Sequence, residues 1–145
     1  MAKLMVHGKA ARTCLARGVA RLAAAVEPTL GPKGLNAMVD RPVGTPLVTR
    51  DGVSIASEIE LNDRFENMGA QVVREVSMQT NDVAGDGTTT AIVLANALIQ
   101  NGVELTGAGV RPVDLCRGID LAVQTIVAAI DASSRDCADD PASLG

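Results

Sequence analysis

The stretch Gly85-Asp86-Gly87-Thr88-Thr89-Thr90 joins two segments whose apolar spacing predicts helices, so it must form the turn between them. Its glycines allow a tight turn and a close approach to a ligand. Its threonines open the second helix, where free amides and the helix dipole favour an anion. The Asp86 carboxylate suits Mg²⁺ that bridges to phosphate oxygens. The stretch predicts a phosphate and Mg²⁺ site, with simple helix capping by Asp86 and Thr88 as the alternative.

The composition is typical of one soluble, mainly helical domain. Of the 145 residues, 47% are hydrophobic but only 1% are aromatic, with Phe65 as the single aromatic residue. The core must therefore be built from small aliphatic side chains, which let helices pack closely. A net charge of −4 and the lack of aromatic stacking platforms make nucleic acid an unsuitable partner.

The sequence lacks the signals of export, membrane insertion and metal clusters. It contains neither an apolar run of membrane-spanning length nor a signal peptide, so we expect a cytoplasmic protein with no membrane partner. Three widely spaced cysteines without a C-x-x-C pair predict neither a zinc cluster nor a disulfide framework.

Upstream of the central stretch, an amphipathic helix is predicted over residues 9–27 and is ended by Pro28. Thr29-Leu30-Gly31-Pro32-Lys33-Gly34 then has the composition of a loop, whose amides and Lys33 could meet an anion; a plain turn is the alternative. Short strands are predicted over residues 36–40 and 46–49, with a possible third over 53–56. Asp51-Gly52 is a strong turn dipeptide, so Asp51 serves either backbone geometry or the orientation of an attacking water.

Three further helices complete the predicted pattern. The first runs over residues 63–83, begun by a capping arrangement of Asp63 and Glu66. The second starts at Thr88 and is apolar on nearly all sides, so it should be buried in a complete fold. The third starts at Arg111-Pro112 and runs to about residue 133. Beyond residue 136 the periodicity ends, which is typical of a link.

Several ordered motifs together resemble the N-terminal equatorial part of GroEL-type (group I) chaperonins, over about residues 3–135. The resemblance implies a mainly α fold, namely a helical bundle like that of the equatorial domain with a small β-hairpin. In this chain that domain is incomplete. It assigns residues 1–135 to the N-terminal part of an equatorial ATP-binding domain and residues 136–145 to the start of a link to an intermediate domain. The motifs are Thr29-Leu-Gly-Pro-Lys-Gly34, Asp51-Gly-Val-Ser54, Glu58-Ile-Glu-Leu61, Phe65-Glu-Asn-Met-Gly-Ala-Gln71, Ala84-Gly-Asp-Gly-Thr-Thr-Thr90 and Arg117-Gly-Ile-Asp120.

The resemblance also implies roles for individual residues. Asp51 corresponds to the acid implicated in hydrolysis, Asp86 to the carboxylate that holds Mg²⁺, and Arg50 stands where the bacterial pattern usually has lysine. Because a guanidinium is a planar fork and an ammonium a compact charge, this departure can change the phosphate geometry. The implied ATP-binding residues are Thr29, Leu30, Gly31, Pro32, Arg50, Asp86, Gly87, Thr88, Thr89 and Thr90.

Family members are subunits of ATP-dependent double rings that fold unfolded client proteins, with a GroES-type co-chaperonin as partner. The family chain is several times longer, and the adenine pocket, the client-binding surface and the second catalytic carboxylate have no counterpart here. We therefore expect half a nucleotide site, a homo-oligomer only when complete, and no turnover by these 145 residues alone. The alternative is a truncated, non-enzymatic interaction module; an unrelated phosphotransferase is disfavoured because Walker and kinase motifs are absent.

Overall fold

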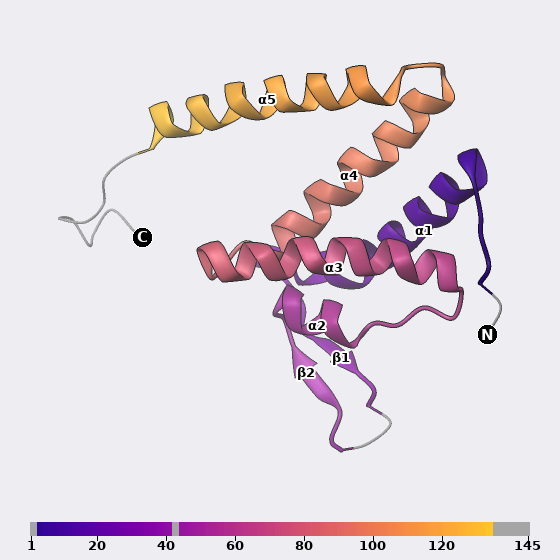
Figure 1. The fold of residues 1–145 in the computed structure, drawn as a ribbon. Helices are drawn as coiled ribbons and strands as arrows, with labels where there is room; N and C mark the ends of the chain where they lie inside the picture. The colour runs from indigo at the N-terminus through magenta and orange to yellow at the C-terminus, as the bar shows by residue number, and fades with distance from the viewer. Residues whose placement is uncertain (1–2, 42–43, 135–145) are drawn as a thin grey trace. The chain divides into compact units, whose positions relative to one another are not determined.

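The computed structural model of the chain describes residues 3–41 and 44–134 (Figure 1). The chain divides into two units, residues 1–107 and residues 108–145. The first unit holds every described element except α5, and each unit is considered by itself. The elements are α1 (Gly8–Val26), the 3₁₀ helix η1 (Glu27–Thr29), β1 (Ala37–Val39), β2 (Leu47–Thr49), α2 (Gly52–Glu58), α3 (Arg64–Ala84), α4 (Thr88–Gly107) and α5 (Pro112–Ser133). The predicted mainly helical fold with a small hairpin is confirmed.

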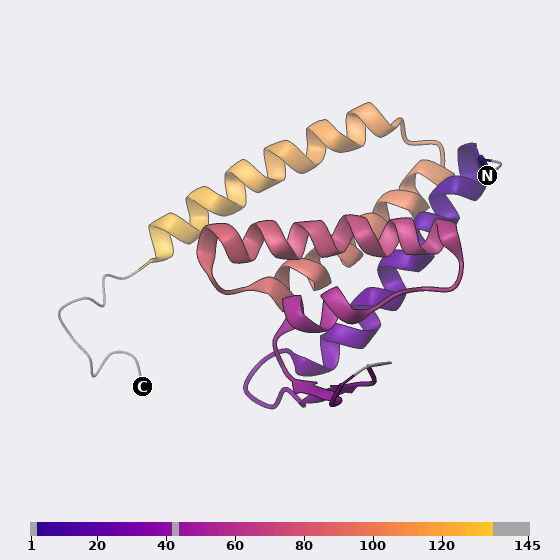
Figure 2. The ribbon, with the colours of Figure 1, turned by 60° about the horizontal axis from the view of Figure 1, so that its bottom comes forward.

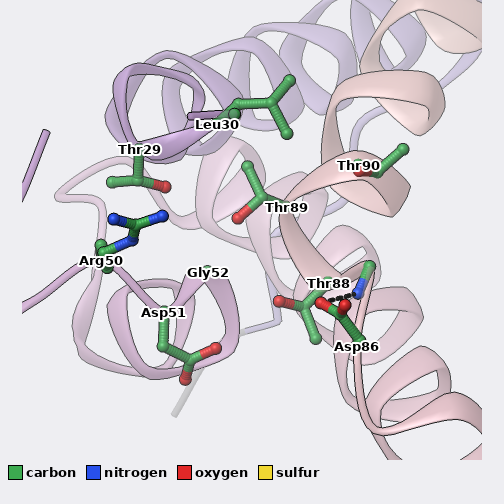
Figure 3. A pocket seen from close by; sticks show the side chains of 11 residues that line it. Thr29, Leu30, Arg50, Asp51, Gly52, Asp86, Thr88, Thr89 and Thr90 are labelled. Carbon is green, nitrogen blue, oxygen red and sulfur yellow. Dashed lines mark hydrogen bonds between the residues drawn. The ribbon is translucent and has the colours of Figure 1, made fainter. Parts of the chain in front are cut away.

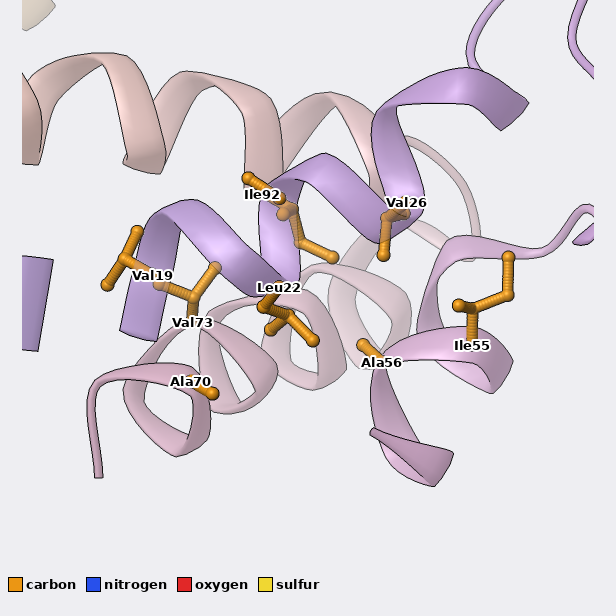
Figure 4. Packing of buried hydrophobic residues seen from close by; sticks show 9 residues of the cluster. Val19, Leu22, Val26, Ile55, Ala56, Ala70, Val73 and Ile92 are labelled. Carbon is orange, nitrogen blue, oxygen red and sulfur yellow. The ribbon is translucent and has the colours of Figure 1, made fainter. Parts of the chain in front are cut away.

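The first unit is built on α1, which packs against both α3 and α4 (Figures 1 and 2). In Figure 4, Val19 and Leu22 of α1 lie against Ala70 and Val73 of α3. The small aliphatic core that the composition predicts is thus present. The buried cluster consists of Val19, Leu22, Ala23, Val26, Ile55, Ala56, Ala70, Val73 and Ile92.

The crossing of α1 and α3 is close enough for backbones to touch. A Cβ atom added at Gly18 would lie 1.8 Å from the carbonyl oxygen of Glu66, and one added at Gly69 would lie 2.1 Å from that of Leu15. Neither position has room for a side chain, so glycine is required on both helices. This reciprocal contact fixes how far apart the two helices lie.

An ion pair adds to the same crossing. The side chain of Glu66 is 4% exposed and lies 2.6 Å from Arg17 and 3.1 Å from Arg21 of α1. Asp63 caps α3 as predicted, because its side chain accepts hydrogen bonds from the amides of Phe65 and Glu66. The carboxylate of Glu66 instead pairs with arginines of α1, so its main role is to hold α1 and α3 together.

The predicted hairpin is confirmed, but the predicted third strand is wrong. β1 and β2 pair antiparallel with Ala37 opposite Thr49 and Val39 opposite Leu47. The possible strand over residues 53–56 lies within helix α2, since the side chain of Asp51 accepts a hydrogen bond from the amide of Ser54 at 3.0 Å and caps a helix there. The cap outweighs the preference of β-branched residues for strands.

Large apolar side chains of α4 and α5 are exposed in this chain. In α4 only Thr88 and Ile92 are buried, while Leu94 is 58% and Leu98 is 51% exposed. This agrees with the expectation that α4 is uncovered when the rest of the family fold is absent. No residue of α5 is buried within the described part of the chain. The predicted link at residues 136–145 lies outside the described residues.

Candidate functional site

Three segments that lie far apart in the sequence line one cavity of about 290 Å³ (Figure 3). They are the loop after α1, the segment that leads into α2, and the turn between α3 and α4. Every residue predicted to bind ATP or to act in hydrolysis lines this cavity except Pro32, and Gly52 is an addition. The lining residues are Thr29, Leu30, Gly31, Arg50, Asp51, Gly52, Asp86, Gly87, Thr88, Thr89 and Thr90.

The N-terminus of α4 offers free backbone amides to the cavity. The amide of Ala91 donates to the carbonyl oxygen of Gly87 at 2.9 Å, which is the first hydrogen bond of the helix. The amides of Thr88, Thr89 and Thr90 come before it and have no carbonyl partner within α4. Together with the helix dipole they make this end of the cavity favourable for an anion.

Asp86 stands beside these amides without capping them. Its Oδ1 accepts a hydrogen bond from the amide of Gly87 at 2.6 Å, and in residues 3–41 and 44–134 no other hydrogen bond of this carboxylate is found. The capping alternative for Asp86 therefore finds no support in α4. One exposed carboxylate beside anion-binding amides fits the way in which Mg²⁺ is held by one or two carboxylates and phosphate oxygens. The described part of the chain has no cluster of three or more side chains that could hold a metal by themselves.

Asp51 combines a backbone role with a position at the cavity. Its Oδ2 accepts hydrogen bonds from both the amide and the hydroxyl of Ser54, so it caps α2. The side chain is exposed and lines the cavity. Asp51 thus has a backbone role, but as the cap of a helix rather than in the predicted turn. The predicted role in hydrolysis stays a prediction.

Gly52 lines the cavity, although the sequence predicted for it a turn and a place in the Asp51-Gly-Val-Ser54 motif but no binding role. A Cβ atom at this position would lie 2.3 Å from Oγ1 of Thr89 and 2.9 Å from its backbone nitrogen. The N-terminal ends of α2 and α4 therefore touch at Gly52. The one signal for this contact in the sequence is a glycine at the start of a helix, directly after its capping aspartate.

The loop after α1 is held in a fixed shape. The hydroxyl of Thr29 donates to the carbonyl oxygen of Val26 at 2.7 Å, and the amide of Leu35 donates to that of Pro28 at 2.9 Å. This loop brings Leu30 and Gly31 to the cavity, whereas Pro32 and Lys33 do not line it.

The charges around the cavity are mixed. Arg50 and Thr29 lie on one side, and Asp86 and Thr88 lie on the other (Figure 3). Arg50 is exposed and forms no ion pair with the described residues. A site that offers a guanidinium, free amides and two carboxylates suits a phosphate group whose charge is shared with a divalent cation.

Comparison with known proteins places the chain in a family. Residues 22–144 match the TCP-1/cpn60 chaperonin family. The chain belongs to this family. The chain is also 68% identical over 134 residues to chaperonin GroEL 4 of Bradyrhizobium diazoefficiens. The resemblance to GroEL-type chaperonins is thus confirmed.

The match to this chaperonin covers 92% of the chain but only 25% of the relative. The chain therefore spans about a quarter of the length of the curated relative that it matches. Within the described residues, no helix is both long enough and apolar enough to cross a membrane.

Proposed function

We propose that this chain is part of an ATP-dependent chaperonin subunit that assists protein folding, and that it supplies the phosphate and Mg²⁺ half of the ATP site. The observation that carries the proposal is the single cavity at which the Thr29 loop, Asp51 and the N-terminus of α4 meet. We assign residues 1–135 to the equatorial ATP-binding domain and residues 136–145 to the start of a link to an intermediate domain.

The proposed roles follow from the chemistry of the lining groups. The free amides of Thr88, Thr89 and Thr90, with the guanidinium of Arg50, would hold phosphate oxygens. Asp86 would hold Mg²⁺, which when bound neutralises part of the charge of the phosphates. Asp51 would orient the attacking water or accept its proton.

The size of the cavity supports half a site. Pockets that enclose a drug-sized ligand have volumes of roughly 300–1,000 Å³, so a cavity of about 290 Å³ is just below that range. The cavity suits the phosphates of ATP more than a whole nucleotide. We propose that contacts to adenine come from parts of a complete subunit that this chain does not contain.

Unfolded clients, a GroES-type co-chaperonin and a homo-oligomeric ring are the partners that follow from this proposal, in a cytoplasmic setting. A second candidate is a short interaction module that associates with chaperonin subunits without ATP turnover. It is favoured by the exposed apolar side chains of α4, including Leu94 and Leu98. Large exposed apolar surface marks a site of protein contact.

Two proteins would separate these candidates. The first is the 145-residue chain, and the second is an exchange chimera, in which the matched region of the Bradyrhizobium chaperonin is replaced by the corresponding residues of this chain. We expect Mg²⁺-dependent phosphate release and ATP-dependent ring assembly from the chimera, and neither from the isolated chain. A chimera that assembles with the relative's subunits but releases no phosphate would favour the interaction module and overturn the proposed ATP site.

A further inference from the structure

α2 is a short helix with the candidate site at one end. It has seven residues, Gly52–Glu58, and Asp51 caps its N-terminus at the cavity. Isolated helices shorter than about 12–15 residues are marginal in water, so contacts with the rest of the fold must hold α2 in place. Ile55 and Ala56 supply part of that support, because both are buried in the core.

Arg74 of α3 binds the opposite end of α2. Its Nε donates a hydrogen bond to the carbonyl oxygen of Ala56 at 2.8 Å, and its Nη2 donates to that of Ile59. Ala56 is among the last four residues of α2, whose carbonyl groups have no partner within the helix. The planar guanidinium satisfies two carbonyl groups at once, and its positive charge suits the C-terminal end of a helix.

The other polar contacts near this end do not bind carbonyl groups of α2. Arg41 pairs with Glu58 in the last turn, and both residues are half-buried, but this contact is made to a side chain and not to the backbone. The side chain of Asn67 accepts a hydrogen bond from the amide of Leu61 at 3.0 Å. Leu61 lies beyond the end of α2, so this contact does not hold the helix itself. Among the described residues, Arg74 is thus the side chain that binds the backbone in the last turn of α2.

A tilt of α2 would move Asp51 and Gly52 at the cavity. A helix of seven residues is about 10 Å long, so a tilt of about 10° around its middle moves each end by roughly 1 Å. At the N-terminal end, Gly52 already touches Thr89, which leaves no space for such a movement toward α4. A displacement of about 1 Å at a reacting group can slow a reaction by about 10²-fold.

We propose that Arg74 is a positioning residue for Asp51: by binding the C-terminal carbonyl groups of α2, it holds the Asp51 carboxylate at its place in the cavity. The consequence for turnover rests on the proposed function. The effect of Arg74 on the stability of α2 does not rest on the proposed function, and it can be measured separately.

The first test measures turnover in the exchange chimera. Arg74→Gln is expected to lower kcat for phosphate release by about 10-fold to 10²-fold while ATP affinity changes by less than about twofold. Arg74→Lys should recover part of the rate, because it keeps the charge and one donor. In an Asp51→Ala background, Arg74→Gln should cause little further loss. Equal losses of affinity and rate, or full additivity with Asp51→Ala, would overturn the proposal.

The matched control is Arg64→Gln, on the same helix. Arg64 is exposed and, among the described residues, forms no hydrogen bond or ion pair through its side chain. The Arg64→Gln variant should leave both kcat and the affinity for ATP unchanged. A loss equal to that of Arg74→Gln would attribute the effect to charge alone and would overturn the proposal.

The second test is amide hydrogen exchange, which does not depend on turnover. In Arg74→Gln, exchange over residues 53–58, including the Ser54 amide that Asp51 binds, should accelerate about tenfold or more, because the two charged hydrogen bonds of Arg74 are lost. Exchange in α4 should not change. Unchanged exchange in α2, or equal acceleration in α1, α3 and α4, would contradict a specific hold on α2. If the parent chimera releases no phosphate, the proposed function fails, and this exchange test still decides the role of Arg74.

Discussion

Replacing Gly52 by alanine is expected to force apart the N-terminal ends of α2 and α4. The new Cβ atom would lie 2.3 Å from Oγ1 of Thr89 and 2.9 Å from its backbone nitrogen, whereas ordinary contacts begin at 3.4 Å. The hydroxyl of Thr89 can rotate away, but its backbone nitrogen cannot. The two helix ends must therefore separate by about 0.5 Å, the difference between 3.4 and 2.9 Å.

Two effects on stability compete in this variant. Alanine is favoured over glycine inside a helix by up to about 1 kcal/mol, and less at a first helical position. Overpacking costs about 1–3 kcal/mol. Because overpacking has the greater effect on stability, the thermal transition of the exchange chimera should shift to lower temperature. The same shift moves the amides of α4 relative to Asp51, and we expect the affinity for Mg²⁺-ATP to fall about tenfold.

Isothermal titration of the chimera with Mg²⁺-ATP would measure this effect. Gly107→Ala is the matched control, because Gly107 also lies in a helix and a Cβ atom there would meet nothing within 4 Å. That variant should bind Mg²⁺-ATP with unchanged affinity. If Gly52→Ala also binds with unchanged affinity and melts at the same or a higher temperature, then the two helix ends do not meet as the structure has them.

Three further predictions concern hydrolysis, the α1–α3 crossing and the isolated chain. In the chimera, Asp51→Ala should slow phosphate release by roughly 10²-fold or more with ATP binding retained, and equal loss of both would make Asp51 purely structural. Removing both Arg17 and Arg21 should destabilise the chimera to urea by about 3 kcal/mol, because the buried Glu66 carboxylate loses its partners; an unchanged midpoint would contradict this. The isolated 145-residue chain should self-associate in sedimentation velocity, bind ATP weakly and release no phosphate, because large apolar side chains of α4 and α5 are exposed. Burying roughly 400 Å² of apolar surface would contribute on the order of 10 kcal/mol to the free energy of association. A sharp thermal transition of a monomer with steady phosphate release would refute this.

The long helices could be predicted from the sequence because their signals are local. Asp63 caps α3, and Pro112 starts α5, each where the periodicity begins. α2 was missed because a segment of four residues with Val53 and Ile55 fits a strand as well as a helix. The decision came from the Asp51 side chain, which caps a helix by binding the amide of Ser54.

Most of the residues that line the cavity were named from the sequence, partly from loops rich in glycine, threonine and aspartate and partly from the resemblance to GroEL-type chaperonins. Their roles in binding and hydrolysis stay predictions. What could not be predicted depends on contacts between distant segments. The need for glycine at position 52 arises from Thr89, and the burial of Glu66 arises from its pairing with two arginines of α1. Neither partner is marked by spacing along the chain, so local motifs indicated a turn and a capping arrangement instead.

The most direct test of the phosphate and Mg²⁺ site is the dependence of ATP affinity on Mg²⁺ in the exchange chimera and in its Asp86→Ala variant. Asp82→Ala is the matched control, since Asp82 is an exposed acid near the end of α3 that does not line the cavity. We expect Mg²⁺ to raise ATP affinity in the parent and in Asp82→Ala, and to have no such effect in Asp86→Ala, which should also lose phosphate release. An Asp86→Ala variant with the same Mg²⁺ dependence and full turnover would contradict the site described here.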